Sequence, residues 1–215
     1  MAQVPTGTTF FIASSYGPTK VTTVLTNAAE AVVTCTGHGY ANGDIVEIAS
    51  GWGRINLRNF RIKAVTTDTF ALEGMDTTST TFFPAGAGAG TVRKASTWQQ
   101  ITMITAVSSN GGDPVTGDYK YLESDVRYKM NDGFNGTDYT LTLDADAIST
   151  PGYTALKNLT DVQTNTILRV VTRSGQIQLI PGTVALNESV QMNDGQINTV
   201  TASISGNNRT TRYAS

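Results

Sequence analysis

The sequence predicts a mainly β fold, namely a β-sandwich with one flanking α-helix and a small inserted β module. Threonine is unusually common, with 35 residues, and 21 glycines mark frequent turns. β-Branched side chains fit a pleated sheet and lose rotamer freedom in a helix. Many short runs alternate apolar and polar residues, which is the period of a strand with one buried face. Only residues 149–162 carry the signals of a helix.

Length, charge and cysteine content narrow the class of protein. A chain of 215 residues buries roughly 70% of its extended surface, so it needs neither metal nor disulfide to hold a core. Its one cysteine, Cys35, excludes a disulfide within the chain and fits a reducing compartment. The net charge of −2 predicts no basic surface for binding nucleic acid. We expect no signal peptide and no membrane helix, because neither an n-region nor a long apolar run is present.

Two shifts in composition indicate an insertion at residues 28–91 within a larger core domain formed by residues 1–27 and 92–215. Strand-like segments flank the insertion at 8–13 and 20–25 before it and at 91–95 and 97–105 after it. Four short alternating runs separated by turn signals predict a small barrel-like or sandwich module. These runs are residues 30–36, 44–49, 59–65 and 68–73. The Gly-rich segment at 77–90 suits a flexible arm or a return loop.

The remainder of the core is predicted as strands around the helix. The alternation predicts a long strand at Asp118–Met130 and a shorter one at Asp138–Asp146. Ser149 or Thr150 offers an N-cap oxygen, and Pro151 at an early helical position needs no N–H partner. Tyr153, Leu156 and Leu159 share one face, so we expect the helix to lie against a sheet. Two strand pairs, at 166–181 and 183–206, and a short basic tail at 207–215 complete the chain.

No constellation for chemistry emerges, so we predict no enzyme, no catalytic or metal residue and no cofactor. Cys35 and His38 supply two ligands where a closed zinc site needs four. The chain holds no G-x-S-x-G turn, no phosphate-binding Gly-Lys motif and no third glycine to complete a dinucleotide fingerprint at residues 86–90. The pairs Glu123/Asp125 and Asp144/Asp146 each project from a single strand face, whereas glycosidase carboxylates normally oppose each other across a cleft.

Two predicted strands present hydrophilic faces suited to line a water-filled passage. On the strand at 119–130, Glu123 and Asp125 lie on the face opposite Leu122 and Val126. On the strand at 196–204, hydroxyl residues lie opposite Val200, Ala202 and Ile204. An acidic or neutral wall repels DNA phosphates and prevents adhesion. The lumen-facing candidates are Glu123, Asp125, Thr199, Thr201 and Ser203. The ordinary outer surface of a sandwich is the alternative that the sequence leaves open.

The order of these segments resembles a known family. The long strand, the helix STPGYTALKNL, the hairpins from ILRVVTRSGQIQLIPG to NTVTASISG and the terminal NRTTRY are similar to the major tail tube proteins of long-tailed, siphovirus-like bacteriophages. The insertion, with TGHGYANGDIVEI and DTFALEG, is similar to small β modules of phage virion proteins. Together these likenesses cover nearly the whole chain.

The resemblance implies a structural protein of the virion tail, assembled in the host cytoplasm. Hexameric rings would stack into a hollow conduit for genome delivery, with the inner sheets of six copies joined in one shared β-barrel. The implied partners are further copies of the chain, a tape measure protein and tail tip or terminator proteins. DNA would pass the lumen without specific binding. Candidate contacts between copies are the N-terminal arm, Thr80–Gly90 with Phe82 and Phe83, and the tail with Arg209, Arg212 and Tyr213.

Two other functions stay open. A virion-surface or adhesion module would bind carbohydrate through an aromatic platform of Tyr40, Trp52 and Trp98. A β-rich hydrolase would depend on Asp144 or Glu123. Packing explains both tryptophans without a ligand, since Trp52 follows a glycine in a turn and Trp98 begins a strand. The tail tube hypothesis therefore ranks first and the hydrolase last.

Overall fold

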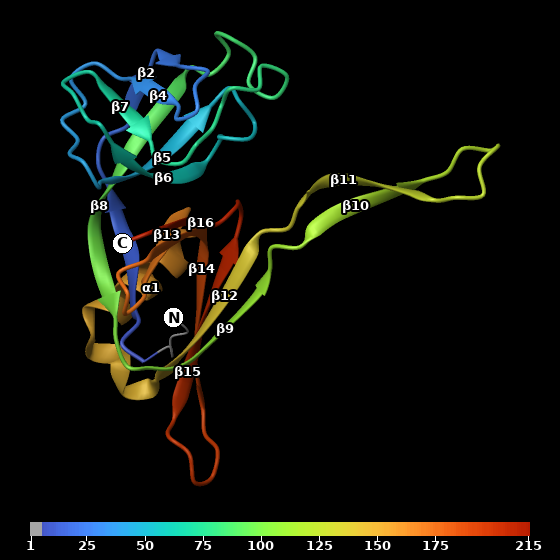
Figure 1. Cartoon of the computed structure of the whole chain (residues 1–215). Coiled ribbons are helices and arrows are strands. Elements are labelled where there is room, and N and C mark those ends of the chain that lie inside the picture. Colours follow the sequence, from blue (N-terminus) through green and yellow to red (C-terminus); the bar gives the residue numbers. More distant parts are fainter. Residues whose placement is uncertain (1–5) are drawn as a thin grey trace.

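The structure, a computed structural model, describes residues 6–215. Strands dominate it and α1 (Pro151–Val162) is its one α-helix within that range, which confirms the predicted fold class. Figure 1 shows a lower body that contains the helix, an upper body of short strands and a long hairpin that projects from between them. Residues 1–5, part of the N-terminal arm expected to contact other copies, lie outside the described residues.

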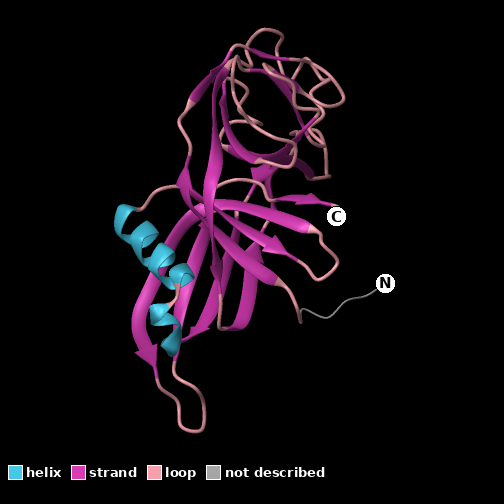
Figure 2. Ribbon diagram, turned by 90° about the vertical axis from the view of Figure 1, so that its left-hand side faces the viewer, coloured by secondary structure: helices cyan, strands magenta, loops and turns pink. Residues whose placement is uncertain are grey.

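A curled antiparallel sheet forms the lower body. Its strand order brings segments from the two ends of the chain together, because the early strand β1 lies between β8 and the late strand β13. Figure 2 shows the strands of this sheet beside the helix. The order is β8 (Gly90–Ile101), β1 (Thr9–Tyr16), β13 (Thr166–Val171), β14 (Ile177–Gln191), β15 (Thr199–Gly206), β12 (Thr137–Asp144) and β9 (Ile104–Gly111).

The helix covers one face of this sheet as its sequence predicts. Thr150 is the N-cap, and its Oγ1 accepts a hydrogen bond from the Tyr153 N–H at 3.3 Å. A 3₁₀ turn, Ala145–Ser149, leads into the cap. Tyr153, Leu156 and Leu159 are buried against the sheet. Gly152 permits the close approach to β8, since a Cβ there would lie 2.3 Å from the Gln100 carbonyl oxygen.

Alternation along the strands decides which residues enter this core. Side chains at every second position of β12, β14 and β15 pack toward the helix, and the intervening residues point to the opposite face. The buried set on these three strands is Leu141, Leu143, Ile180, Val184, Leu186, Val200, Ala202 and Ile204. On β12 and β15 the core therefore uses one face of the sheet, whereas a second buried cluster with Ala13, Ile167 and Leu179 covers the opposite face of β1, β13 and the start of β14.

The upper body is formed largely by the predicted insertion. Its four expected strands are present as β4 (Val32–Thr34), β5 (Ile45–Ser50), β6 (Arg58–Lys63) and β7 (Thr69–Leu72), joined by β2 (Lys20–Thr22) and β3 (Val24–Leu25). It has its own buried cluster, around Trp52, Phe60 and Phe70. The first half of β8 pairs with β5 and β2, so one long strand runs from the upper body into the lower one.

The Gly-rich segment at 77–90 is a packed return loop. Thr77 is buried and its hydroxyl bonds the carbonyls of Thr26 and Ala28. The ring of Phe83 meets that of Trp52 edge-on at 5.3 Å. This loop therefore completes the core of the upper body.

The C-terminal tail ties the two bodies together. β16 (Thr211–Tyr213) pairs with the start of β14. Tyr213 is only 8% exposed, and its hydroxyl oxygen accepts a hydrogen bond from the Arg61 N–H of β6 at 2.9 Å. Thr211 Oγ1 donates to the Asn59 carbonyl at 3.1 Å. These contacts join residues about 150 positions apart in the chain.

The predicted long strand at Asp118–Met130 is wrong. The chain reverses within it, giving β10 (Pro114–Tyr119) and β11 (Tyr128–Phe134), which pair with each other in a separate two-stranded ribbon. The alternating pattern continues across the reversal, because the tip loop at 120–127 contains no glycine or proline to mark a turn. We call residues 114–134 the arm.

The two predicted strand pairs at 166–181 and 183–206 also differ from the structure. They share one strand, since β14 continues without a break through Pro181 and Gly182. Gly182 is required where β14 meets β15, because a Cβ there would lie 2.4 Å from the Ser205 carbonyl oxygen. The Pro-Gly pair is thus a site of close strand contact and not a turn.

Candidate assembly surfaces

The sheet face opposite the helix carries a band of small hydroxyl side chains. The register places Thr140 beside Ser203 and Thr142 beside Thr201 on β12 and β15. Residues paired in this way project to the same side of an antiparallel sheet. Thr199 pairs with Asp144 at the end of the same ladder. We call Thr140, Thr142, Thr199, Thr201 and Ser203 the hydroxyl face.

The strands on either side extend the hydroxyl face without adding positive charge. On β14, Ala185 pairs with Ser203 and Asn187 with Thr201. On β9, Ser108 pairs with Thr140, and Asn110 with Asp138. The face is therefore short-chained, neutral to acidic and free of aromatic side chains. Such a surface is wettable and does not attract phosphates.

The lower sheet ends in a free edge at β9. This strand pairs with β12 on one side and, within residues 6–215, with no strand on the other. Seven of its eight residues are exposed. An exposed edge presents unpaired backbone N–H and C=O groups that favour pairing with another chain. β9 is therefore a second surface suited to assembly.

The arm is the third surface. Figure 1 shows it extending away from both bodies. The rings of Tyr119 and Tyr128 stack at 5.4 Å, and Tyr121 meets Tyr119 edge-on at 5.6 Å. Its exposed apolar and aromatic residues are Val115, Tyr119, Tyr121, Leu122, Val126, Tyr128, Met130 and Phe134. An apolar concentration of this kind on a monomer marks an interaction site.

Glu123 and Asp125 lie in the loop at the tip of the arm, between β10 and β11. They were predicted to face the lumen from the alternation of a strand, and a loop has no such alternation of faces. Thr199, Thr201 and Ser203 do lie on a strand, β15, with side chains opposite the buried Val200, Ala202 and Ile204. The structure thus brings together three of the five lumen candidates and separates them from the other two.

The candidate contacts between copies divide into exposed and internal side chains. Phe82 is exposed, with the Arg54 guanidinium 3.7 Å from its ring centre. Arg212 is also exposed and donates to Gln176 at 3.0 Å. Phe83 and Tyr213 are buried in contacts within the chain and are not available to another copy in this conformation.

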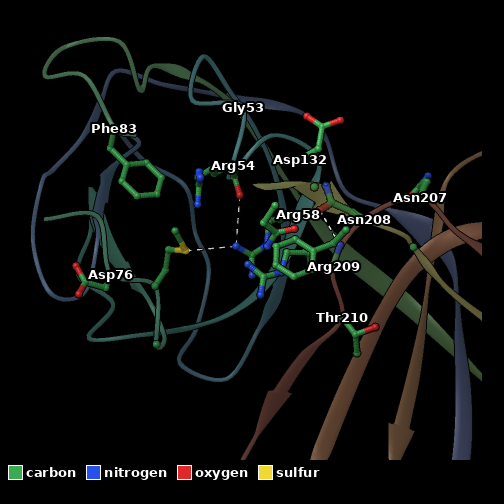
Figure 3. Close-up of a pocket in the computed structure, with 16 residues that line it drawn as sticks. Gly53, Arg54, Arg58, Asp76, Phe83, Asp132, Asn207, Asn208, Arg209 and Thr210 are labelled. Carbon is green, nitrogen blue, oxygen red and sulfur yellow. Dashed lines mark hydrogen bonds between the residues drawn. The ribbon is translucent and has the colours of Figure 1, made fainter. Parts of the chain in front are cut away.

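Three arginines gather in a cleft that sequence reasoning did not find. Arg54 and Arg58 come from the upper body and Arg209 from the tail, and the base of the arm completes the wall (Figure 3). The cleft has a volume of about 870 Å³. Burial, and then the nearby charge of Arg209, lower the pKa of Arg58. We call this site the arginine cleft. Of its three arginines, the sequence analysis singled out only Arg209, as part of the basic tail.

The aromatic side chains proposed as a carbohydrate platform are not arranged as one. Trp52 is 1% exposed, and its Nε1 donates to the Pro84 carbonyl at 2.8 Å. Trp98 is covered by the Arg169 guanidinium, 4.3 Å from its ring centre. The Tyr40 hydroxyl is buried and the ring packs on His38 and Phe70. The rings are therefore used in packing.

Asp144, which was considered as a catalytic carboxylate, has a structural role. Asp144 caps the 3₁₀ turn by accepting from the Asp146 N–H at 3.0 Å. Across residues 6–215, no three His, Cys, Asp or Glu side chains are grouped as metal ligands would be. Over the same described range, none of the helices has the length and apolar character to span a membrane.

Comparison with known protein families gives a match. The sequence profile described as "Phage tail tube protein, TTP" matches residues 50–215. No curated protein matches the chain. The matched residues include β6 and β7 of the upper body and every strand of the lower sheet except β1.

Proposed function

Because the chain belongs to the phage tail tube protein family, and is thus a structural protein of the virion tail, we propose that it closes into hexameric rings that stack into a hollow conduit for the genome. The proposal rests most on one observation. Over β15, β12 and β9 the sheet has a covered apolar face and an uncovered hydroxyl face, and within residues 6–215 it ends at β9, whose outer edge has no partner strand. A ring gives both the free face and the free edge a role.

In the proposed ring, β9 of one copy pairs with a strand of the next, so that the sheets of six copies form a shared barrel. The hydroxyl face lines the lumen, with Thr199, Thr201 and Ser203 at its centre. Small neutral side chains leave the passage wide and hydrated, and the acidic Asp138 and Asp144 nearby repel phosphate. DNA would then pass without specific binding.

The arm supports stacking. Apart from Phe134, whose ring faces the Arg209 guanidinium, its large apolar residues are left exposed by residues 6–215, and a two-stranded ribbon is at best marginally stable alone in water. Contact with a neighbouring copy would bury these side chains and order the ribbon. Glu123 and Asp125, at the tip, are then reassigned from the lumen to contacts between copies.

A tape measure protein in the lumen and terminator or tip proteins at the ends complete the proposal, with assembly in the host cytoplasm.

Imaging tests the assembly. Purified protein at increasing concentration is followed by sedimentation and by electron microscopy, and we expect sixfold annular particles and tubes. A reconstruction should show a backbone ladder between β9 and a neighbouring copy. A protein that remains monomeric at all concentrations, or rings whose sheets end within each copy, would contradict the proposal.

A lumen variant tests the passage separately. Thr201→Lys with Ser203→Lys adds two cations to the hydroxyl face, and we expect normal tubes but reduced DNA delivery by phage carrying them, because cations bind phosphate. Thr154→Lys with Asn158→Lys places the same charge on the exposed side of α1 and is the matched control. Equal infectivity of the two double variants would show that the hydroxyl face does not line the lumen.

A further inference from the structure

The three guanidinium groups of the arginine cleft lack carboxylate partners. Within residues 6–215, the ion pairs made by arginine are Arg61 with Glu73 and Arg93 with Glu47, both outside the cleft. Arg58 instead donates to the Arg54 carbonyl at 3.3 Å and to the Met75 sulfur at 3.6 Å. Its Nε is buried without a hydrogen-bond partner in the part of the chain described. An unpaired buried donor on a charged group is costly, so the site is suited to an anion.

The acidic residues at the cleft do not neutralise it. Asp76 accepts hydrogen bonds from the Thr78 N–H and hydroxyl at 2.8 and 2.7 Å. Asp132, drawn in the upper part of Figure 3, also lines the cleft. Three arginines therefore face two aspartates, neither of which forms an ion pair with them among the described residues. The cleft keeps an excess of positive charge.

Apolar side chains share the cleft with the arginines. Met75, Phe83 and Phe134 line it, and the Arg209 guanidinium lies 4.4 Å from the centre of the Phe134 ring. Planar guanidinium groups bind carboxylates in a bidentate manner while their faces stay on aromatic rings. The ligand that fits is a segment with a carboxylate next to an apolar side chain.

The tip of the arm has this chemistry. Leu122, Glu123 and Asp125 are exposed and follow one another within four residues. The tip cannot fill the cleft of its own chain, because Asn131–Phe134 at the base of the arm form one wall of the cleft and the arm extends away from it. From Pro114 to Leu122 the arm reaches at most roughly 26 Å at about 3.3 Å per residue, which is far enough to meet another copy.

We propose that the arginine cleft receives the arm tip of a neighbouring copy. Leu122 lies against Met75, Phe83 and Phe134, and the carboxylates of Glu123 and Asp125 pair with Arg54, Arg58 and Arg209. The interface is heterologous, since the tip and the cleft are different surfaces of one chain, and it therefore propagates from copy to copy. This inference rests on the proposed tube and specifies one contact within it.

Crosslinking tests the contact directly. Glu123→Cys with Arg209→Cys introduces two exposed thiols, while the natural Cys35 is buried. On mild oxidation of assembled tubes we expect a ladder of linked chains on a denaturing gel. Asp161→Cys with Arg209→Cys, which has its first thiol on α1, is the control and should give no ladder. Tubes of the first variant without crosslinks would overturn the inference and leave the proposed tube intact.

Charge exchange gives a second measurement. Arg54→Glu with Arg209→Glu should raise the protein concentration needed for tubes at least tenfold, because carboxylates would then face the tip. Glu123→Arg with Asp125→Arg should do the same, and the four changes together should restore assembly. Arg173→Glu is the control, on an exposed arginine outside the cleft. Failure of the combined variant to recover, with its fold intact by circular dichroism, would refute the pairing. Absence of tubes from the unaltered protein would instead refute the proposed function.

Discussion

Shortening the arm should leave the monomer folded and prevent assembly. Replacing Val115–Gly133 by Asn-Gly joins Pro114 to Phe134 through a two-residue turn that suits a hairpin. It keeps the Phe134 ring under Arg209. No residue of the replaced segment belongs to the buried clusters of the described chain. Because surface changes of this kind stay near 0.5 kcal/mol, we expect the melting temperature to move by at most about 1–2 °C.

The cost to assembly follows from the same exposed side chains. Tyr121, Leu122, Val126 and Met130 are each more than half exposed. Fully burying one such side chain contributes roughly 1.5–3 kcal/mol, so partial burial of four at about 1 kcal/mol each gives roughly 4 kcal/mol per arm. A tenfold change in an equilibrium constant corresponds to about 1.4 kcal/mol. The concentration needed for tubes should therefore rise about a thousandfold.

Calorimetry and sedimentation measure the two halves of this prediction. Scanning calorimetry of dilute protein reports the melting temperature, and sedimentation across a concentration series reports the threshold for tubes. Asn158→Ala, on the exposed side of α1, is the control for surface change. Tubes formed by the shortened chain within tenfold of the normal threshold would refute the reasoning about the arm. A large fall in melting temperature would refute the claim that the arm stands outside the core.

Three further changes test the cap, the tail and an ion pair. Thr150→Ala should lower the free energy of unfolding by about 1 kcal/mol, since the Tyr153 N–H loses its cap, whereas Thr150→Ser should retain most of it. Tyr213→Phe should cost about 1–3 kcal/mol in denaturant unfolding, because the Arg61 N–H is left without its acceptor; an unchanged midpoint would mean that this bond does not hold the tail. The hydrogen bond from Arg61 lowers the pKa of Glu73 below 4.5, so its contribution to stability is present above that pH and is lost on acidification. The melting temperature of Glu73→Gln should accordingly fall below that of the unaltered chain at pH 6 and converge with it toward pH 3; a constant gap would count against the pair.

Local signals were sufficient for the helix and for most strands. Thr150, Pro151 and the spacing of Tyr153, Leu156 and Leu159 specify the cap, the start and the buried face of α1, and each depends only on nearby residues. The alternation around Thr199–Ser203 likewise gave the correct side of β15. These features could be predicted because short-range backbone geometry determines them.

Local sequence patterns could not predict the arm or the arginine cleft. Alternation reports that a backbone is extended but not where it reverses, and the reversal at Leu122–Asp125 has no glycine or proline. The glycines that do matter are at the base of the arm, where a Cβ on Gly136 would lie 1.8 Å from the Gly206 carbonyl oxygen. The cleft depends on Arg58 and Arg209 meeting across the fold, and no local pattern encodes a contact between residues so far apart in the chain.

The pairing of β1 with β13 and the seating of Tyr213 on β6 have a consequence for how the protein is made. On the ribosome, the strands of the upper body emerge early and nearly in sequence, so their core can close during translation. β1 must wait for β13, which is made about 150 residues later. The tail at 207–215 leaves the ribosome later still and then fastens the two bodies together. Translation order thus delays the surfaces needed for tube growth until these late segments have been made.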